Sequence, residues 1–310
     1  MNYEESLMVK AAWYYFFENL TQQTIADLMG ISRMRVIKLL ERARQCGIIQ
    51  FRLRSDGIGR MELERAMIDR FHLKDVFVIP STPDATELNE SIAKAAAMYI
   101  ADRLQGNPCI NMGYGDTPGR VLNHLAMMAE TPLTCVSLTG GVSYYLPNTR
   151  SNVFNAKLYL MPAPLLVSTK EMADAIRQEA SIVEISRMIG LSQLTVVGIG
   201  STHESATVIR SGILSHNDIL YLTMNGAVGD VLSHFIDRDG NLVQTPLENR
   251  LISTPLSTLR ELSNVIGVAA GLHKVEAIRA VLRGGYLDVL ITDEQTASQL
   301  VSEEPPCASL

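Results

Sequence analysis

Short apolar runs, each followed by a glycine-bearing or polar loop and an amphipathic helix, recur from residue 76 onward and strongly constrain the fold. The runs are residues 76–79, 109–112, 134–138, 194–197, 265–269 and 289–292. Strands that alternate with helices form parallel sheets, because a crossover helix returns the chain to the starting end of the sheet. Strands that are apolar throughout are buried on both faces. The sequence therefore predicts an α/β domain whose parallel sheet is covered by helices on both sides.

The composition is that of a folded protein with a sizeable core. The chain has 310 residues, of which 47% are hydrophobic and 19% are charged. This length accommodates one small and one large domain. No apolar run approaches the roughly 18 residues that span a bilayer, so no membrane association is expected. The four cysteines are scattered and the six histidines show no ligand spacing. We therefore expect a cytoplasmic protein with no metal and no cofactor.

Residues 20–40, LTQQTIADLMGISRMRVIKLL, predict two short helices joined by a tight turn. Thr21 is placed to cap a first helix that begins at Gln22, and Ser32 to cap a second. Gly30 supplies the left-handed residue that the turn requires. This arrangement is typical of a helix-turn-helix, whose second helix lies in the major groove of DNA.

The two faces of these helices divide by polarity. The residues expected to face the core are Ile25, Ala26, Leu28, Val36, Ile37 and Leu40. The residues expected to face outward on the second helix are Arg33, Met34, Arg35 and Lys38. Arginine can bond a guanine edge or phosphate, and lysine can neutralise phosphate. An ordinary helical hairpin with a solvated basic face is the alternative.

The next residues, 48–54, alternate like a strand and predict the start of a small wing. Arg52 and Arg54 would share one face of this strand, available for backbone phosphate. The expected DNA contacts are Gln22, Ser32, Arg33, Met34, Arg35, Lys38 and Arg52. Residues 1–60 carry a net charge of +3, whereas the remaining 250 carry −9. A weakly basic head on an acidic body suits selective DNA binding.

The domain organisation follows from these segments. Residues 1–56 are the predicted winged-helix-like domain, 57–73 a linker helix after a glycine-bearing break, 74–301 the α/β domain and 302–310 a disordered tail. The linker helix carries Leu63, Met67, Ile68 and Phe71 on one face. Such a helix could dimerise or dock on the larger domain. Docking is favoured, because four apolar positions are too few for a coiled coil.

Several loops after the predicted strands suggest an anionic, polyhydroxylated ligand. Residues 113–117, GYGDT, end a strand and open a helix, where free N–H groups and a hydroxyl could hold a phosphate. Gly140 and Gly141 allow close backbone approach. Asp230 could accept bonds from sugar hydroxyls, and Lys274 could neutralise phosphate. Ligands of parallel sheets bind outside the carboxyl ends of the strands, where these loops would meet.

The motifs in order resemble the SorC family of sugar-responsive transcription regulators. They are the helix-turn-helix and then MGYGDT, SLTGG, MPAPLLVS, VGIGS, IRSG, NGAVGD, KVEAI and GGYLDVLITDEQTA. The resemblance implies a Rossmann-like effector domain similar to sugar-phosphate isomerases, and homo-oligomers, dimers or commonly tetramers, that bind operators. The effector contacts that it implies are Gly115, Asp116, Thr117, Gly140, Gly141, Asp230 and Lys274. The chain departs from the family's A-G-G-x-x-K pattern, reading AAGLHK at residues 269–274.

The expected function is a repressor of a carbohydrate-utilisation operon, whose affinity for double-stranded operator DNA is controlled by a phosphorylated sugar or polyol. Two alternatives stay open. One is an isomerase-like enzyme with Asp116, His124, Asp230 and Lys274 available for acid–base chemistry. The other is a DNA-binding protein that responds to no ligand. We expect no catalysis, because an enzyme gains nothing from residues 1–55.

Overall fold

The computed structural model describes residues 3–49, 55–129, 132–141, 155–203 and 206–302. The chain divides into two compact units, Met1–Ile58 and Gly59–Leu310. The predicted tail beyond Ser302 lies outside the described residues, as do Arg52 and Arg54 of the predicted wing. Within the described residues, no helix combines the length and the apolarity needed to cross a membrane.

The smaller unit is built from three helices around one apolar core. They are α1 (Tyr3–Phe16), α2 (Gln22–Met29) and α3 (Arg33–Gln45). Helix α1 contributes Met8, Ala11 and Ala12 to the core, which α3 closes with Val36 and Leu39. Small alanines at these positions let the helices cross closely. Helix α1 thus packs behind the helix-turn-helix.

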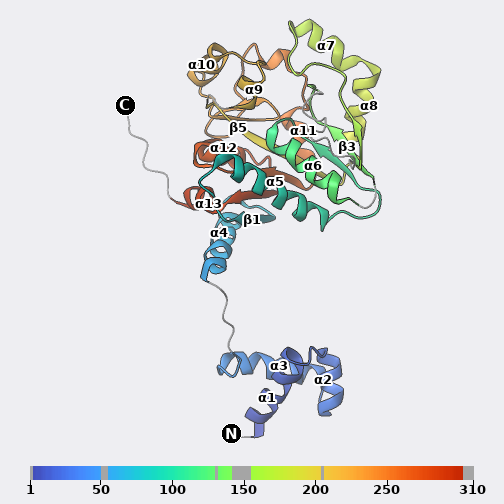
Figure 1. Cartoon of the computed structure of the whole chain (residues 1–310), viewed down its shortest axis with the longest axis vertical. Coiled ribbons are helices and arrows are strands. Elements are labelled where there is room, and N and C mark those ends of the chain that lie inside the picture. Colours follow the sequence, from blue (N-terminus) through green and yellow to red (C-terminus); the bar gives the residue numbers. More distant parts are fainter. Residues whose placement is uncertain (1–2, 50–54, 130–131, 142–154, 204–205, 303–310) are drawn as a thin grey trace. The chain divides into compact units, whose positions relative to one another are not determined.

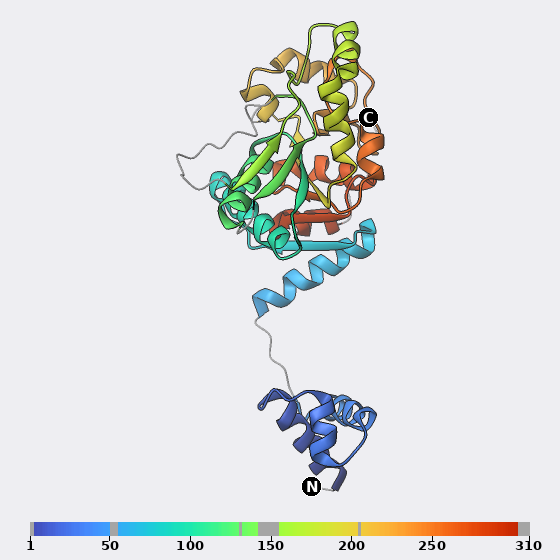
Figure 2. The same ribbon diagram turned by 90° about the vertical axis from the view of Figure 1, so that its right-hand side faces the viewer.

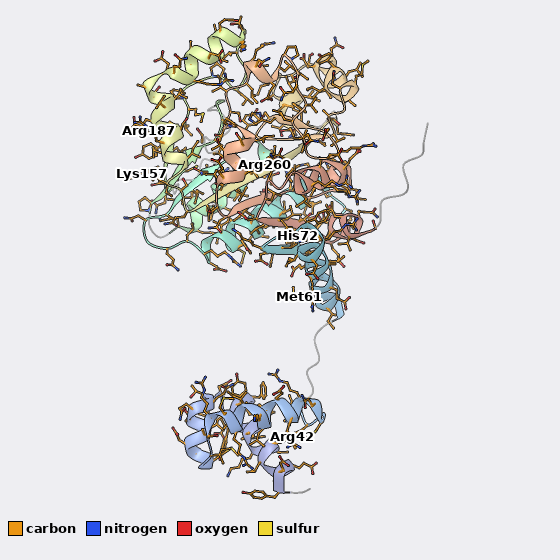
Figure 3. The ribbon with its side chains drawn as sticks, turned by 180° about the vertical axis from the view of Figure 1, so that it is seen from behind. Arg42, Met61, His72, Lys157, Arg187 and Arg260 are labelled. Atoms are coloured by element: carbon orange, nitrogen blue, oxygen red, sulfur yellow. The ribbon has the colours of Figure 1, made fainter. Side chains whose placement is uncertain are left out.

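Helix α4 (Ser55–Phe71) packs on the larger unit. Met67 is fully buried in the same core cluster as the sheet, and Leu63, Ile68 and Phe71 pack against that cluster. The helix begins at Ser55, two residues before the predicted start at Gly57, and includes Gly57 and Gly59. Met61 lies on the exposed side of α4 (Figure 3).

The larger unit contains a sheet with strand order β1-β9-β8-β5-β2-β3-β4, all parallel. A short antiparallel pair, β6 and β7, extends from the end of β5. The strands are β1 (Asp75–Ile79), β2 (Cys109–Met112), β3 (Leu133–Ser137), β4 (Ala156–Tyr159), β5 (Leu194–Ser201), β6 (Gly229–Val231), β7 (His234–Ile236), β8 (Val265–Val268) and β9 (Val289–Asp293).

Helices cover both faces of this sheet (Figures 1 and 2). Helices α5 (Ala85–Ala101) and α6 (Asp116–Met128) form one layer, and their apolar sides share a core with the sheet. Helices α4, α8, α12 and α13 contribute to the core on the other face. The bounds of these and the other α-helices of the unit are α7 (Lys170–Gln178), α8 (Ala180–Ile189), α9 (Thr207–Arg210), α10 (His216–Met224), α11 (Leu256–Glu261), α12 (Val275–Arg283) and α13 (Glu294–Val301).

Alternation along β2 shows how the two cores are separated. Ile110 and Met112 enter the α5–α6 core, whereas Asn111 points to the opposite face. There the buried Asn111 amide donates to the backbone oxygen of Ile189, at the end of α8, and to the Thr195 hydroxyl, both over 3.0 Å. A buried polar group that is fully paired fixes one register of helix on strand.

Candidate DNA-binding surface and effector cavity

The ends of α2 and α3 have the geometry of a helix-turn-helix. The Thr24 backbone N–H donates to the Thr21 hydroxyl over 3.2 Å, and that of Arg35 donates to the Ser32 hydroxyl over 3.3 Å. Gly30 ends α2 in the left-handed conformation, with φ 64°. Each cap and the turn glycine lie where the sequence predicts them.

The outward face of α3 is accessible in the described unit. Arg33, Met34, Arg35 and Lys38 are all exposed. Gln22 and Arg33, the first residues of α2 and α3, line one open hollow together with Thr21. The amino ends of both helices therefore border the same hollow, as they do in proteins that bring backbone N–H groups to DNA phosphates.

Near its carboxyl-terminal end, α3 forms an ion pair with α1. The guanidinium of Arg42, which is labelled in Figure 3, forms an ion pair with the Glu4 carboxylate of α1. This contact uses one of the basic side chains of α3 within the unit. The basic side chains of its first turns stay on the open surface.

Two details of this unit differ from the sequence prediction. Leu28, expected in the core, is 58% exposed, because the eight-residue α2 contacts its neighbours mainly through Ile25 and Ala26. Ile37 is only partly buried, and Leu39 and Ala43 complete the core instead. At the predicted wing, residues 48 and 49 form a bend rather than a strand, and residues 50–54 lie outside the described residues.

In the larger unit, a cavity of about 610 Å³ opens at the carboxyl ends of β2, β5, β8 and β9. Among the predicted residues, Gly115, Asp116, Thr117, Asp230 and Lys274 line it. Crossover loops of a parallel sheet gather at this edge, which is why segments more than 150 residues apart in sequence meet here.

The α6 end of the cavity is already paired within the protein. The Asp116 carboxylate accepts from the Asn89 amide over 2.6 Å and from the Arg120 guanidinium over 3.1 Å. The Thr117 hydroxyl, expected to hold phosphate, instead donates to the Asn89 carbonyl oxygen over 2.7 Å. A carboxylate at this helix end repels an anion, so this side suits hydroxyl groups rather than phosphate.

Two cationic side chains of the cavity lining lack such partners. Lys274 and Arg210 both line the cavity, and in the described part of the chain neither forms an ion pair with a carboxylate. Burial lowers the pKa of Lys274, the Asp230 and Asp116 carboxylates act against this shift, and the Arg210 charge adds to it. Two cations that repel each other across a partly desolvated wall favour a bound anion.

Asp230 is 8% exposed and lies on β6. Burial raises the pKa of its carboxyl to about 6. The Ser233 backbone N–H, which donates to the carboxylate over 3.1 Å, and the Lys274 charge lower this pKa and so oppose the effect of burial. The neighbouring strand makes room through Gly200, where a Cβ would come within 1.9 Å of the Asp230 carboxylate. Gly200, the second glycine of the VGIGS motif, thus permits the carboxylate to reach the cavity.

Gly140 and Gly141 are not among the described residues that line the cavity. Their backbone N–H groups donate to the oxygens of Ile252 and Ala163, both over 2.9 Å. A Cβ at Gly140 would lie 2.4 Å from the Pro164 oxygen. Close packing of three loops explains why these two positions are glycine.

Arg210, Asn89 and Arg120 are among the polar cavity residues that the sequence reasoning missed. The signal for Arg210 was present in the IRSG motif, where it stands at the end of α9. Asn89 and Arg120 lie inside helices and show no local pattern. His273 faces His203, with ring centroids 5.9 Å apart, and burial followed by the Lys274 and His203 charges lowers its pKa.

Comparisons with known proteins extend over the whole chain. Residues 55–302 match the Sugar-bind family of sugar-binding domains. The transcriptional regulator LsrR from Enterobacter sp. (strain 638) is 32% identical over 303 residues, which are 96% of this chain and 94% of that protein. The chain belongs to the SorC family of sugar-binding transcriptional regulators.

Further relatives agree with this assignment. LsrR from Escherichia coli (strain K12) is 33% identical over 302 residues, 96% of this chain and 95% of that one. The full-length sorbitol operon regulator SorC from Klebsiella pneumoniae has a TM-score of 0.69 at 26% identity, over 97% of this chain and 100% of that one. Residues 9–46 also match region 4 of sigma-70, a second sign of a helix-turn-helix.

The SorC-family chain is thus a DNA-binding regulator that a sugar effector controls, and not an enzyme. The predicted fold, a helix-turn-helix followed by a parallel α/β domain, is confirmed. Of the groups weighed for catalysis, Asp116, Asp230 and Lys274 line the cavity. His124 is not among the described lining residues and instead pairs with Glu90 over 2.8 Å.

Proposed function

We propose that this regulator represses a carbohydrate-utilisation operon and releases its operator when a phosphorylated sugar or polyol fills the cavity. The observation that carries the proposal is the wall formed by Lys274 and Arg210, two cations without carboxylate ion pairs in the described structure. A phosphate there would neutralise both charges and gain charge-assisted hydrogen bonds.

The rest of the cavity supports a polyhydroxylated ligand. Asp230 presents acceptor oxygens for sugar hydroxyls, and Asp116 with Asn89 forms a second polar group. A volume of about 610 Å³ has room for a small sugar phosphate with water. We propose Lys274 and Arg210 as phosphate contacts, and Asp230, Asp116 and Gly115 as contacts to the carbon chain.

We further propose that Gln22, Ser32, Arg33, Met34, Arg35 and Lys38 meet the operator, with Arg52 as a backbone contact. Residues up to about 58 would form the DNA-binding unit, and the remainder the effector and oligomerisation unit in a cytoplasmic dimer or tetramer. Two heads are needed because helix-turn-helix proteins bind half-sites about 34 Å apart, one turn of DNA.

A thermal-shift screen of the full chain tests the ligand. Sugar and polyol phosphates should raise the unfolding temperature, since a ligand at 100 times its Kd stabilises the native state by about 2.7 kcal/mol. Their unphosphorylated parents are the matched controls. The compounds that stabilise the protein should then release it from the promoter DNA of its own operon, measured by fluorescence anisotropy. Equal stabilisation by the parents would contradict the phosphate contact, and release by no compound would contradict the regulatory role.

A further inference from the structure

Helix α4, which leads along the chain into the DNA-binding unit, is tied to the segments that border the effector cavity. Arg60 of α4 lies 3.8 Å from the Glu294 carboxylate, at the first residue of α13. The Glu64 carboxylate accepts from the Val78 backbone N–H on β1 over 2.8 Å. Both partners stand close in sequence to cavity-lining residues, since Glu294 lies between Asp293 and Gln295, and Val78 precedes Thr82 by four positions.

The contact at Val78 has a clear physical cause. Strand β1 is the edge of the described sheet and pairs with β9 on one side. The outward N–H of Val78 would otherwise be left for solvent, and Glu64 binds it from α4. Burial raises the pKa of Glu64, whereas its bond to Val78 and the Arg60 charge favour the ionised form. Helix α4 is therefore held by polar contacts as well as by its apolar face.

Asp293 connects these contacts to the cavity loop. Its carboxylate accepts from the Ser81 hydroxyl, from the Thr296 hydroxyl and from the Gly271 backbone N–H, the last over 3.2 Å. The side chain is 1% exposed although it borders the cavity. Gly271 opens the short turn Leu272–Lys274, which carries Lys274 of the cationic wall. The Ser81 hydroxyl in turn accepts from the Gln295 backbone N–H over 2.8 Å.

We propose that Asp293 is a positioning residue that couples the cavity to α4, through the Ser81 and α13 corner and the contacts at Glu294 and Val78. The proposal rests on the proposed function, because it takes the effector to act on the turn that carries Lys274. An effector that draws Lys274 inward shifts Gly271, the donor at 3.2 Å. The Ser81 loop and the start of α13 then change position, and the first turns of α4 become more or less ordered.

The size of the coupling is limited by the effector's preference for one arrangement of the protein. A ligand shifts the corner only as far as it prefers one arrangement over the other. Asp293 can transmit such a preference because one buried carboxylate holds three segments: the Gly271 turn, the Ser81 loop and the start of α13. The Gly271 N–H also donates to the Thr296 hydroxyl over 2.9 Å, so the turn, the carboxylate and the start of α13 form one hydrogen-bond network in which a shift of one segment strains the bonds to the others.

Hydrogen–deuterium exchange of the full chain, without ligand, tests the coupling. Asp293→Asn should raise amide exchange about tenfold both in residues 269–274 and in the first turns of α4, since a buried charged hydrogen bond is lost. Glu294→Gln should raise exchange about two- to fivefold in α4 alone, because it removes a partly exposed ion pair. Glu276→Gln breaks the exposed pair with Arg238 and is the matched control, expected to change neither segment.

The outcome that overturns the proposal is faster exchange at residues 269–274 in Asp293→Asn with α4 unchanged. If Asp293→Asn does not fold, Ser81→Ala removes one of the three bonds and should give the same pattern at lower amplitude. Unchanged α4 exchange in Ser81→Ala then counts against the coupling.

Inorganic phosphate as the probe separates this proposal from the proposed function. It should slow exchange at residues 269–274 and alter α4 in the wild type. In Glu294→Gln the first effect should remain and the second should be weaker, because only the Glu64–Val78 contact is left. Slower exchange at 269–274 with no change in α4 of the wild type would overturn the coupling and leave the cavity assignment intact. Without any effect at 269–274 the phosphate contact is contradicted, and the ligand-free comparison still decides the coupling.

Discussion

The two proposed binding regions of this protein handle charge in opposite ways. On α3 the basic side chains at Arg33, Arg35 and Lys38 are exposed. In the cavity Lys274 and Asp230 are withdrawn from water. Burial lowers the pKa of Lys274 and raises that of Asp230, so in both residues it favours the neutral form. A surface that meets a polyanion can keep its charges solvated until contact. A site for a small ligand must desolvate its charges in advance, and this costs stability that the ligand restores.

The largest expected effect is on the cavity side of this comparison. Lys274→Met should abolish the response to ligand, removing a coupling of about 5- to 150-fold in operator affinity, while ligand-free DNA affinity stays the same. Titration of DNA-bound protein with the stabilising sugar phosphate measures it. Lys170→Met, an exposed lysine of α7, is the control and should respond like the wild type. A wild-type response in Lys274→Met would show that the cationic wall is misassigned.

The buried Asp230 should make stability depend on pH. Its pKa of about 6 exceeds the ordinary 3.8, so between these values the folded state binds a proton that the unfolded state does not. The free energy of unfolding should therefore fall as the pH rises from about 4 to 7, by about 2–3 kcal/mol relative to Asp230→Asn. Urea unfolding of both proteins across this range measures the difference.

Asp218 supplies the control of opposite sign. The Ser215 hydroxyl and backbone lower the pKa of Asp218, so its contribution should be complete above pH 3.8 and be lost as the pH falls through that region. Relative to Asp218→Asn, the wild type should thus show no slope between pH 5 and 7. If the difference between the wild type and Asp230→Asn is also flat from pH 4 to 7, Asp230 is not desolvated.

On the exposed side, Arg35→Ala should weaken operator binding by about 1–3 kcal/mol and relax base choice, because arginine reads base edges. The fold should be unaffected, since the side chain is exposed. Arg44→Ala, near the other end of α3, is the matched control. Binding curves on the operator and on single-base variants measure both. An Arg35→Ala protein that binds all of them like the wild type would exclude α3 as the reading helix.

The smallest expected effect concerns the cap that orients α3. Ser32→Ala removes the acceptor of the Arg35 backbone N–H and should cost the DNA-binding unit about 1 kcal/mol. Ser32→Asp keeps an acceptor at this position and should retain the stability. Thermal unfolding followed by circular dichroism compares the three proteins. Equal loss in both variants would mean that the cap is not what stabilises the helix.

Most of the sheet could be predicted from sequence because its central strands are apolar on both faces. The prediction for 109–112 coincides with β2, and those for 76–79, 194–197 and 289–292 fall within strands. Strand β4 was missed, because it is an edge strand with half-exposed residues and no apolar run. Strands β6 and β7 were missed because three residues are too few to show a period.

The cavity likewise combines residues that local sequence patterns could predict and residues whose role depends on distant partners. Asp230 stands in the glycine-bearing NGAVGD motif and Lys274 precedes α12, which are positions where sequence reasoning looks for ligands, and both line the cavity. Thr117 also lies there, but its hydroxyl is used by Asn89, a residue 28 positions away that no local pattern indicates. Gly140 satisfied the same pattern and instead packs against Pro164.

The sequence by itself determined the helix-turn-helix, the parallel sheet and the edge at which a ligand would bind. These depend on periodicity, caps and turn residues, which act over a few neighbouring positions. Only the tertiary structure decided which charges at that edge remain free, and that Asp293 joins the cavity to α4. Hydrogen bonds and burial link residues distant in sequence, and the partner of a buried carboxylate is fixed only when the segments have packed.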